Sequence, residues 1–470
     1  MEQRWKVLLI TSVGLFMASL DLFIVNIAFP DMAADFHGAS LSSLSWVLNA
    51  YAIVFAALLV PAGRIADRVG RKRVFITGLL LFAAASGLCA VAPSIPFLVA
   101  ARVLQAAGGA MMIPTTLGLI LPAFPVSERA LAISIWSAVG GVAAALGPPI
   151  GGLLVQLSWR WIFVVNVPIG IIVAIVAARS LSEIREPEDG RPDLLGAAEL
   201  AFGIALLTLG IVKGPDWGWI DLRSLATFAG VAALVVAFLA RSARHHSPVI
   251  ELPLLRVRSF ALGNLATAVF FAGFGAMLLS GVLVLTEVWG YSALKAGLAL
   301  SPGPLMATLF AVPSGRLGAR IGQRPVTMAG GLTFAAGFAY VLASVGASPE
   351  YASTFLPGFM LSGAGVGMVL GTLPAVVTAS LPPERFATGT AVFGMSRQLG
   401  SAIGVAALVA LLGGTTGGDL LAGLQRGWWF SLAAGLGTAA IALAFGPVGA
   451  ARTEQEPQLP PDLAPQHNPA

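Results

Sequence analysis

The sequence predicts an all-helical membrane protein with about fourteen transmembrane helices. Hydrophobic residues make up 57% of the 470 residues, charged residues only 10%, and the mean hydropathy is +0.87. A soluble protein carries roughly 25% charged residues, so this chain cannot cover a water-facing surface of its size. The apolar excess and the single cysteine, Cys89, also exclude a disordered chain, a collagen-like chain and a disulfide scaffold.

Apolar runs long enough to span a bilayer follow one another along the whole chain. A helix needs about 20 apolar residues to cross the hydrocarbon layer. Such runs lie near 7–29, 44–62, 74–92, 97–120, 131–155, 161–178, 194–212, 224–240, 261–285, 293–313, 326–346, 352–379, 387–412 and 428–448. The first run is long, carries Asp21 and is followed by no small-residue cleavage pattern, so we expect a retained span and not a signal peptide. All four histidines lie outside the runs, and no metal site is expected.

The basic residues indicate an even number of spans with both chain ends in the cytoplasm. If the N-terminus is cytoplasmic, alternate loops should be rich in Lys and Arg. Most of the 27 Lys and Arg residues fall in the predicted inner segments. The predicted outer loops hold only Arg160, Lys213, Arg223, Lys295 and Arg426. The sequence pI of about 9.8 therefore reflects one basic membrane face and is no sign of nucleic-acid binding.

A weak internal repeat divides the chain into two related parts. Segment 63–72 recurs as segment 315–324, and Glu128-Arg129 is echoed by Glu384-Arg385 in the inner loop two spans later. Repeated bundles of this kind form the two halves of secondary transporters. We therefore expect two pseudo-symmetric six-helix bundles.

The repeat also predicts the domain boundaries. The first bundle is expected in residues 1–180 and the second in residues 255–450, with a linker of two additional transmembrane helices in residues 181–254. The segment 451–470 is polar, Pro-rich and free of aromatic residues, so we expect a disordered cytoplasmic tail.

Two charged residues in the middle of predicted spans are the main candidates for function. A charge at the centre of a membrane helix costs roughly 2.5–3.5 kcal/mol, so Asp21 in the first span and Arg102 in the fourth each need a reason. An aspartate in an apolar cavity binds and releases a proton at a pH where exposed aspartates stay ionised, and a nearby arginine opposes that protonation. The alternatives are a permanent structural ion pair, or an Asp21 that caps a kink.

Other polar residues within spans are weaker candidates. Asn26, Asn49, Gln105 and Arg397 are possible cavity residues, and Arg397 could instead contact a loop carbonyl. Glu199 is expected near the cytoplasmic face, where its carboxylate can reach the interface.

The loop of residues 63–73 is the most specific short feature. Gly63 and Gly70 permit a close helix approach and a tight turn. Asp67 lies among basic residues that include Arg64, Arg68 and Arg71, and ion pairs to neighbouring helix ends would hold one conformation. Ordinary positive-inside topology explains the basic residues singly, but not Asp67 or the glycines.

A stripe of small residues follows one face of the fifth span. Gly140, Ala144, Gly147 and Gly151 recur at helical spacing, next to Gly152, so another helix can approach closely. Pro148 and its neighbour Pro149 are expected to bend the helix. Such stripes also occur in many membrane helices as plain packing surfaces.

Several segments resemble motifs of a known family, the fourteen-span drug:proton antiporters of the major facilitator superfamily. Residues 63–73 resemble the loop signature between the second and third spans of the superfamily. Residues 102–109 resemble its fourth-span signature, and residues 147–152 the fifth-span antiporter signature, with Ala143 where glycine is usual. Segments similar to the first, second and sixth spans of the subfamily are 20–30, 46–51 and 159–170.

The resemblance implies a proton-driven exporter of amphipathic, often cationic or aromatic compounds in a bacterial cytoplasmic membrane. In that role Asp21 would release the substrate by taking up a proton, Arg102 would tune the exchange, and loop 63–73 would gate the inward opening. The alternative is a dedicated exporter of one metabolite, such as an antibiotic made by the same cell. Nothing in the sequence separates the two.

Other classes of function find little support in the sequence. No span carries paired carboxylates, a Ser/His arrangement or metal-ligand spacing, so we do not expect an enzyme. No Walker-type phosphate loop is present, so no ATPase subunit is expected. The sequence also shows no rings of charged residues along a pore, so we do not expect a channel. The expected partners are a small amphipathic substrate, protons and the lipid bilayer, with no cofactor because the proton gradient supplies the energy.

Overall fold

The computed structural model describes residues 2–36, 40–185, 192–378, 381, 386–413 and 420–445. Side chains 126, 127, 130, 134 and 386–388 are not described. Within these ranges every regular element is a helix, which confirms the predicted all-helical class. The expected tail 451–470 and the pair Glu384-Arg385 lie outside the described residues.

The helices follow the predicted apolar runs in order. They are α1 (Gln3–Ile27), α2 (Phe29–Asp35), α3 (Leu41–Val69), α4 (Arg71–Ala90), α5 (Ile95–Ala123), α6 (Val126–Val155), α7 (Trp161–Val164), α8 (Asn166–Ser180), α9 (Leu194–Trp217), α10 (Leu222–Ser242), η1 (Leu252–Arg256), α11 (Arg258–Leu283), η2 (Val284–Val288), α12 (Ala293–Leu300), α13 (Pro302–Ile321), α14 (Gln323–Ser344), η3 (Tyr351–Phe355), α15 (Leu356–Thr378), α16 (Phe386–Leu412) and α17 (Leu420–Leu443).

Thirteen helical segments among the described residues are long and apolar enough to cross a membrane. They coincide with the first thirteen predicted runs. The fourteenth run corresponds to α17, a helix of 24 residues that packs against α11 and α14. It does not reach the hydropathy of the other thirteen, because Gln425 and Arg426 lie in its first part.

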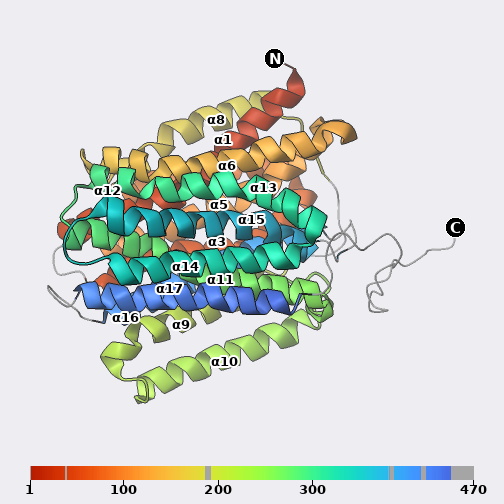
Figure 1. The fold of residues 1–470 in the computed structure, drawn as a ribbon. Helices are drawn as coiled ribbons and strands as arrows, with labels where there is room; N and C mark the ends of the chain where they lie inside the picture. Colours follow the sequence, from red (N-terminus) through yellow and green to blue (C-terminus); the bar gives the residue numbers. More distant parts are fainter. Residues whose placement is uncertain are drawn as a thin grey trace.

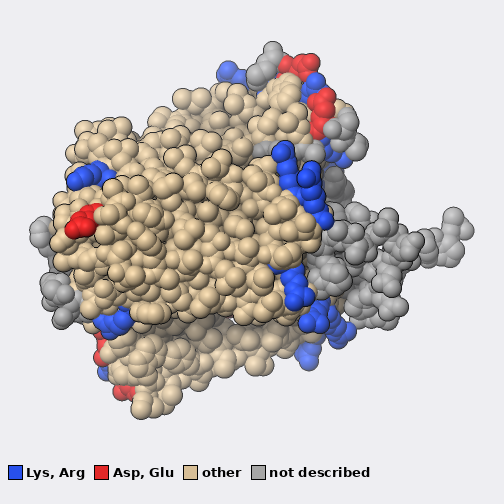
Figure 2. All heavy atoms as spheres, viewed as in Figure 1, with Lys and Arg blue, Asp and Glu red and all other residues tan. Residues whose placement is uncertain are grey.

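The long helices run side by side, and α9 and α10 lie at one edge of the bundle (Figure 1). Uncharged residues cover the broad middle of the visible face, whereas charged side chains gather at its two ends (Figure 2). Most of the visible Lys and Arg lie at the end where the N-terminus lies. This distribution is what a lipid-facing belt with polar ends requires.

The helices pack in two groups. Helices α1, α3, α4, α5, α6 and α8 pack on one another and are called the N-terminal group here; α11–α17 are called the C-terminal group. The groups meet where α3 packs against α16 and where α6 packs against α12 and α13. Helix α9 packs on α10 and also touches both α3 and α16, so it lies beside the first of these seams.

Small residues allow helix backbones to approach closely within the C-terminal group. A Cβ atom at Gly400 would overlap the carbonyl oxygen of Ala268, and a Cβ atom at Gly404 would overlap that of Ala272. The two glycines are one helical turn apart on α16 and face α11. Without water or a strong hydrophobic force between membrane helices, such close van der Waals packing supplies much of their association.

We expect Gly404→Ala to lower the thermal stability of the purified protein. The added methyl group must push α16 away from α11, and overpacking of this kind typically costs about 1–3 kcal/mol. Thermal unfolding in detergent measures the effect. Gly346→Ala is the matched control, because a Cβ atom at Gly346 meets nothing within 4 Å. Equal transition temperatures for the two variants would contradict this account of the helix contact.

Candidate functional site

Asp21 of α1 and Arg102 of α5 form an ion pair inside the N-terminal group. Arg102 Nη1 lies 2.5 Å from Asp21 Oδ2, and each residue is only 1% exposed. Both residues lie in candidate membrane spans. The structure therefore brings together the two residues that the sequence singled out. Each neutralises the charge of the other at a place that water does not reach.

Gln105 and Ser86 complete a hydrogen-bond network around the pair. Gln105 lies one helical turn after Arg102, accepts a hydrogen bond from its Nη1 (2.6 Å) and donates to Asp21 Oδ1 (2.9 Å) and Ser86 Oγ (2.8 Å). Arg102 Nε also donates to the carbonyl oxygen of Val47 (3.1 Å). Both carboxylate oxygens of Asp21 thus accept hydrogen bonds, and the network joins α1, α3, α4 and α5.

Two aromatic rings enclose the guanidinium group of Arg102. Its Cζ atom lies 4.1 Å from the ring centroid of Tyr51 and 5.7 Å from that of Phe163. A cation over an aromatic face gains up to about 2 kcal/mol when both are desolvated. The sequence reasoning did not single out Ser86, Tyr51 or Phe163; Tyr51 and Phe163 lie in quoted family segments, whereas Ser86 gave no signal.

The other predicted cavity residues lie apart from this network. Asn26 donates to the Leu22 carbonyl oxygen of its own helix (2.8 Å). Asn49 is fully buried, and neither its side-chain oxygen nor its nitrogen has a hydrogen-bond partner. Arg397 lies on α16 of the C-terminal group, over the ring of Phe271. None of the three makes a described hydrogen bond to Asp21 or Arg102.

The predicted gating loop is the junction of α3 and α4. Gly70 ends α3 with φ of 125°, a conformation that favours glycine. Arg71 Nε pairs with Asp67 Oδ1 (2.7 Å), and Arg71 Nη1 donates to the carbonyl oxygen of Gly118 on α5 (3.0 Å). Asp67 is thus held by Arg71, which also anchors the junction to α5, while Arg68 is exposed.

Arg64 connects the same junction to the segment before α11. Its Nη1 atom donates to Ser247 Oγ (2.7 Å) and to the carbonyl oxygen of Pro248 (2.8 Å), and its Nη2 atom lies 3.7 Å from Glu251 Oε1. A Cβ atom at neighbouring Gly63 would lie in ordinary contact with Pro114 of α5. The N-terminal group is therefore tied, through Arg64, to the chain that enters the C-terminal group.

The small residues of α6 face two different helices. Cβ atoms at Gly147 and Gly151 would overlap Phe23 and Ile24 of α1. A Cβ atom at Gly152 would overlap the backbone of Ala293 and Leu294 in α12.

The same contact with α12 involves the proline pair and an earlier glycine. The carbonyl oxygen of Pro148 packs against Gly297 of α12, while Gly140 faces Leu15 of α1. The stripe thus packs α6 on α1 within one group and on α12 at the seam between the groups.

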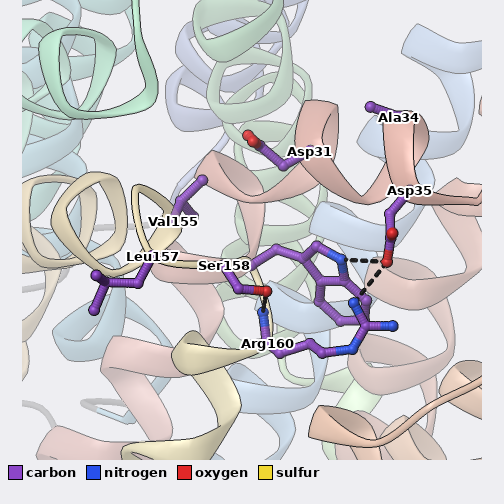
Figure 3. A pocket seen from close by; sticks show the side chains of 8 residues that line it. Asp31, Ala34, Asp35, Val155, Leu157, Ser158 and Arg160 are labelled. Carbon is purple, nitrogen blue, oxygen red and sulfur yellow. Dashed lines mark hydrogen bonds and ion pairs between the residues drawn. The ribbon is translucent and has the colours of Figure 1, made fainter.

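A shallow hollow lies at the end of the molecule where α2 and the α6–α7 connection meet (Figure 3). Asp35 Oδ2 accepts hydrogen bonds from Arg160 Nη1 (2.6 Å) and Trp159 Nε1 (2.9 Å). Asp31, in the first turn of α2, is one of the residues that line the hollow, and partial loss of solvent raises the pKa of its carboxyl above the ordinary value. The Asp35–Arg160 pair ties these loops together.

Long apolar helices in two groups, with a buried ion pair inside the N-terminal group, define a polytopic membrane transport protein. The chain belongs to the Major Facilitator Superfamily, whose family model matches residues 11–280 and 265–467. It is accordingly a multi-pass protein of the cytoplasmic membrane.

Curated relatives cover most of the chain. A probable actinorhodin transporter of Streptomyces coelicolor is 35% identical over 90% of this chain and 75% of its own length. The multidrug resistance protein Stp of Mycobacterium tuberculosis is 33% identical over 89% of this chain and 78% of its own. The multidrug export protein EmrB of Escherichia coli is 30% identical over 84% and 77%, respectively.

Solved structures share the fold at low sequence identity. A D-xylose–proton symporter superposes with a TM-score of 0.69 at 14% identity, over 95% of this chain and 99% of the symporter. A bacterial homologue of the lysosomal transporter Spinster, in an inward-facing conformation, gives a TM-score of 0.63 at 17% identity, over 94% and 96%. These likenesses establish the fold.

We expect the double variant Asp21→Asn/Arg102→Gln to lose less stability than the sum of the losses in the two single variants. Removing one partner of a buried pair leaves the other charge uncompensated, at a cost of about 3–5 kcal/mol, whereas removing both leaves none. Thermal unfolding of the two single variants and the double variant forms the cycle. Strict additivity of the three values would show that the pair carries no coupling energy.

Proposed function

We propose that the protein is a proton-coupled antiporter that exports amphipathic small molecules across the cytoplasmic membrane. The observation that carries the proposal is the Asp21–Arg102 pair, a titratable carboxylate held beside a permanent cation within the membrane-spanning bundle. The names of the relatives, which include multidrug and antibiotic exporters, support the substrate class. The proton gradient is the energy source, with no cofactor or ATPase subunit.

In this mechanism Asp21 changes partners during the cycle. In the paired state the Arg102 guanidinium compensates the charge of the carboxylate, and Gln105 donates a hydrogen bond to its other oxygen. Once the helices move apart, an ionised Asp21 without its cation is costly in an apolar site, so it binds a proton from outside. Return of Arg102 favours release of that proton to the cytoplasm.

The proposed topology has fourteen spans, with α17 as the last and both chain ends in the cytoplasm. The two groups form six-helix bundles that rock about the site, and α9 and α10 are the two additional helices. The concentration of Lys and Arg at the N-terminal end of the visible face supports this orientation.

Two sets of contacts serve as gates in this topology. On the cytoplasmic side, the α3–α4 junction binds α5 through Arg71 and the segment before α11 through Arg64. On the outer side, Gly152 and Gly297 allow α6 and α12 to pack backbone to backbone. Opening either side requires its set of contacts to separate.

A narrower function remains the second candidate. Relatives include a probable actinorhodin transporter and the tetracenomycin C resistance and export protein of Streptomyces glaucescens, so a dedicated exporter of one metabolite or self-made antibiotic fits the same architecture. A panel of substrates that differ in charge and size separates the two.

We expect Asp21→Asn to abolish proton-driven export, because the amide cannot exchange a proton, and Arg102→Ala to impair it strongly. Ethidium accumulation in energised inverted membrane vesicles, with and without a protonophore, measures the coupling. Asp216→Asn is the matched control, because it makes the same Asp-to-Asn change at an exposed carboxylate. Protonophore-sensitive transport at the wild-type rate in Asp21→Asn would overturn the assignment of Asp21, and a wild type that moves no dye would favour the narrow exporter.

A further inference from the structure

Arg397 is a cation within a candidate membrane span and has no carboxylate partner. It lies in the middle of α16, and among the described residues it makes neither an ion pair nor a hydrogen bond. The contact described for its guanidinium group is a cation–π contact: the Cζ atom lies 5.9 Å from the ring centroid of Phe271 on α11. Arg102, by contrast, is fully neutralised. A charge inside a span costs roughly 2.5–3.5 kcal/mol, so an unpaired one needs an explanation.

The backbone around Arg397 is held firmly against α11. Ser396 Oγ donates to Asn264 Oδ1 of α11 (3.1 Å), and Gly400 packs directly on the backbone of Ala268. Both Ser396 and Gln398 are buried, whereas Arg397 between them is only half-buried. The side chain of Arg397 is therefore positioned by close helix packing, and protein does not cover the residue completely.

The face of α16 that carries Arg397 points to the seam between the two helix groups. Gly394, Arg397 and Ser401 share one helical face by their spacing, and all three are half-buried. A Cβ atom at Gly394 would overlap Leu59 of α3 in the N-terminal group. On the other side, Ser401 packs against Gly275 of α11. Arg397 thus lies between α3 and α11.

A chain of aromatic rings continues from Arg397 across this seam. Phe271 and Phe274 of α11 meet edge to face at 5.4 Å, and Phe274 meets Phe23 of α1 at 6.5 Å. Phe23 and Phe274 are half-buried, so their ring surfaces are not fully covered by protein. One guanidinium group and three rings, supplied by both groups, therefore lie on a continuous path.

We propose that Arg397 and this aromatic chain bind aromatic anions, so that the substrates of the exporter include ring systems that carry a carboxylate, sulfonate or enolate group. The inference rests on the proposed export function and adds its substrate class. The guanidinium donates two parallel hydrogen bonds to such a group, and the half-buried rings of Phe274 and Phe23 stack on the ring system. The ligand then supplies the negative charge that no described carboxylate of the protein provides to Arg397.

The test compares an anionic and a cationic dye on the full-length protein. Binding of fluorescein and of ethidium to detergent-purified protein is followed by fluorescence polarisation for the wild type, Arg397→Gln and Arg397→Lys. Arg426→Gln removes an exposed arginine of α17 and is the matched control. Size-exclusion chromatography and thermal unfolding establish that each variant is folded.

We expect the wild type to bind fluorescein, and Arg397→Gln to bind it about 10- to 100-fold more weakly, the loss typical of a charged hydrogen-bonded contact. Arg397→Lys should keep part of the affinity, because the charge remains while the planar fork is lost. Ethidium should bind Arg397→Gln more tightly than the wild type, since a repelling cation is gone. A purely structural role for Arg397 would weaken the binding of both dyes together.

Two outcomes would overturn the proposal: a wild type that binds ethidium but not fluorescein, and equal fluorescein affinities for the wild type and Arg397→Gln. Neither outcome would contradict the proposed proton-driven export, which is measured separately in inverted vesicles. Conversely, Arg397-dependent fluorescein binding without transport under a pH gradient would support the anion site and contradict the proposed antiport.

Discussion

A charge inside an apolar bundle must find its counter-charge within the protein or in a ligand, because lipid supplies none. The Asp21–Arg102 pair meets this constraint completely, and much of the N-terminal group depends on it. Through Arg102, Gln105 and their hydrogen bonds, the pair joins α1, α3, α4 and α5 at one point. Moving any of these helices changes how well the charge is neutralised, and in the proposed antiport mechanism this links the positions of the helices to proton exchange at Asp21.

The two groups of helices meet through two different kinds of surface. At the α6–α12 seam, Gly152 and Gly297 bring backbones into contact, and no titratable side chain takes part in those contacts. At the α3–α16 seam, Arg397 lies over the ring of Phe271 of α11, and α9 packs alongside. A backbone contact without charged groups separates and re-forms at little electrostatic cost, whereas the seam beside Arg397 is where we propose that a ligand binds.

The sequence predicted the spans well because transmembrane segments are selected by composition over about 20 residues, and the same rule identified Asp21, Arg102 and Gln105. It did not predict how these side chains pair, since Tyr51, Ser86 and Phe163 become neighbours only through packing of separate helices. The partners of Arg64 lie more than 180 residues further along the chain, and no local pattern indicates them. Asp67 pairs with Arg71, which was one of several equivalent basic candidates in the loop, so the sequence did not indicate this partner.

The contrast between Arg102 and Arg397 links the energetics of the fold to its chemistry. Both are arginines in apolar helices beside aromatic rings, but within the part of the chain that the structure describes only Arg102 has a carboxylate of the protein as its partner. Adding a second internal carboxylate would have been a simple way to stabilise Arg397, and it would also have closed the site to an anion. An unpaired cation destabilises the empty protein, and an anionic ligand that neutralises the charge stabilises the protein when it binds. In the proposed site, Arg397 therefore lowers the stability of the empty protein and discriminates between substrates by their charge.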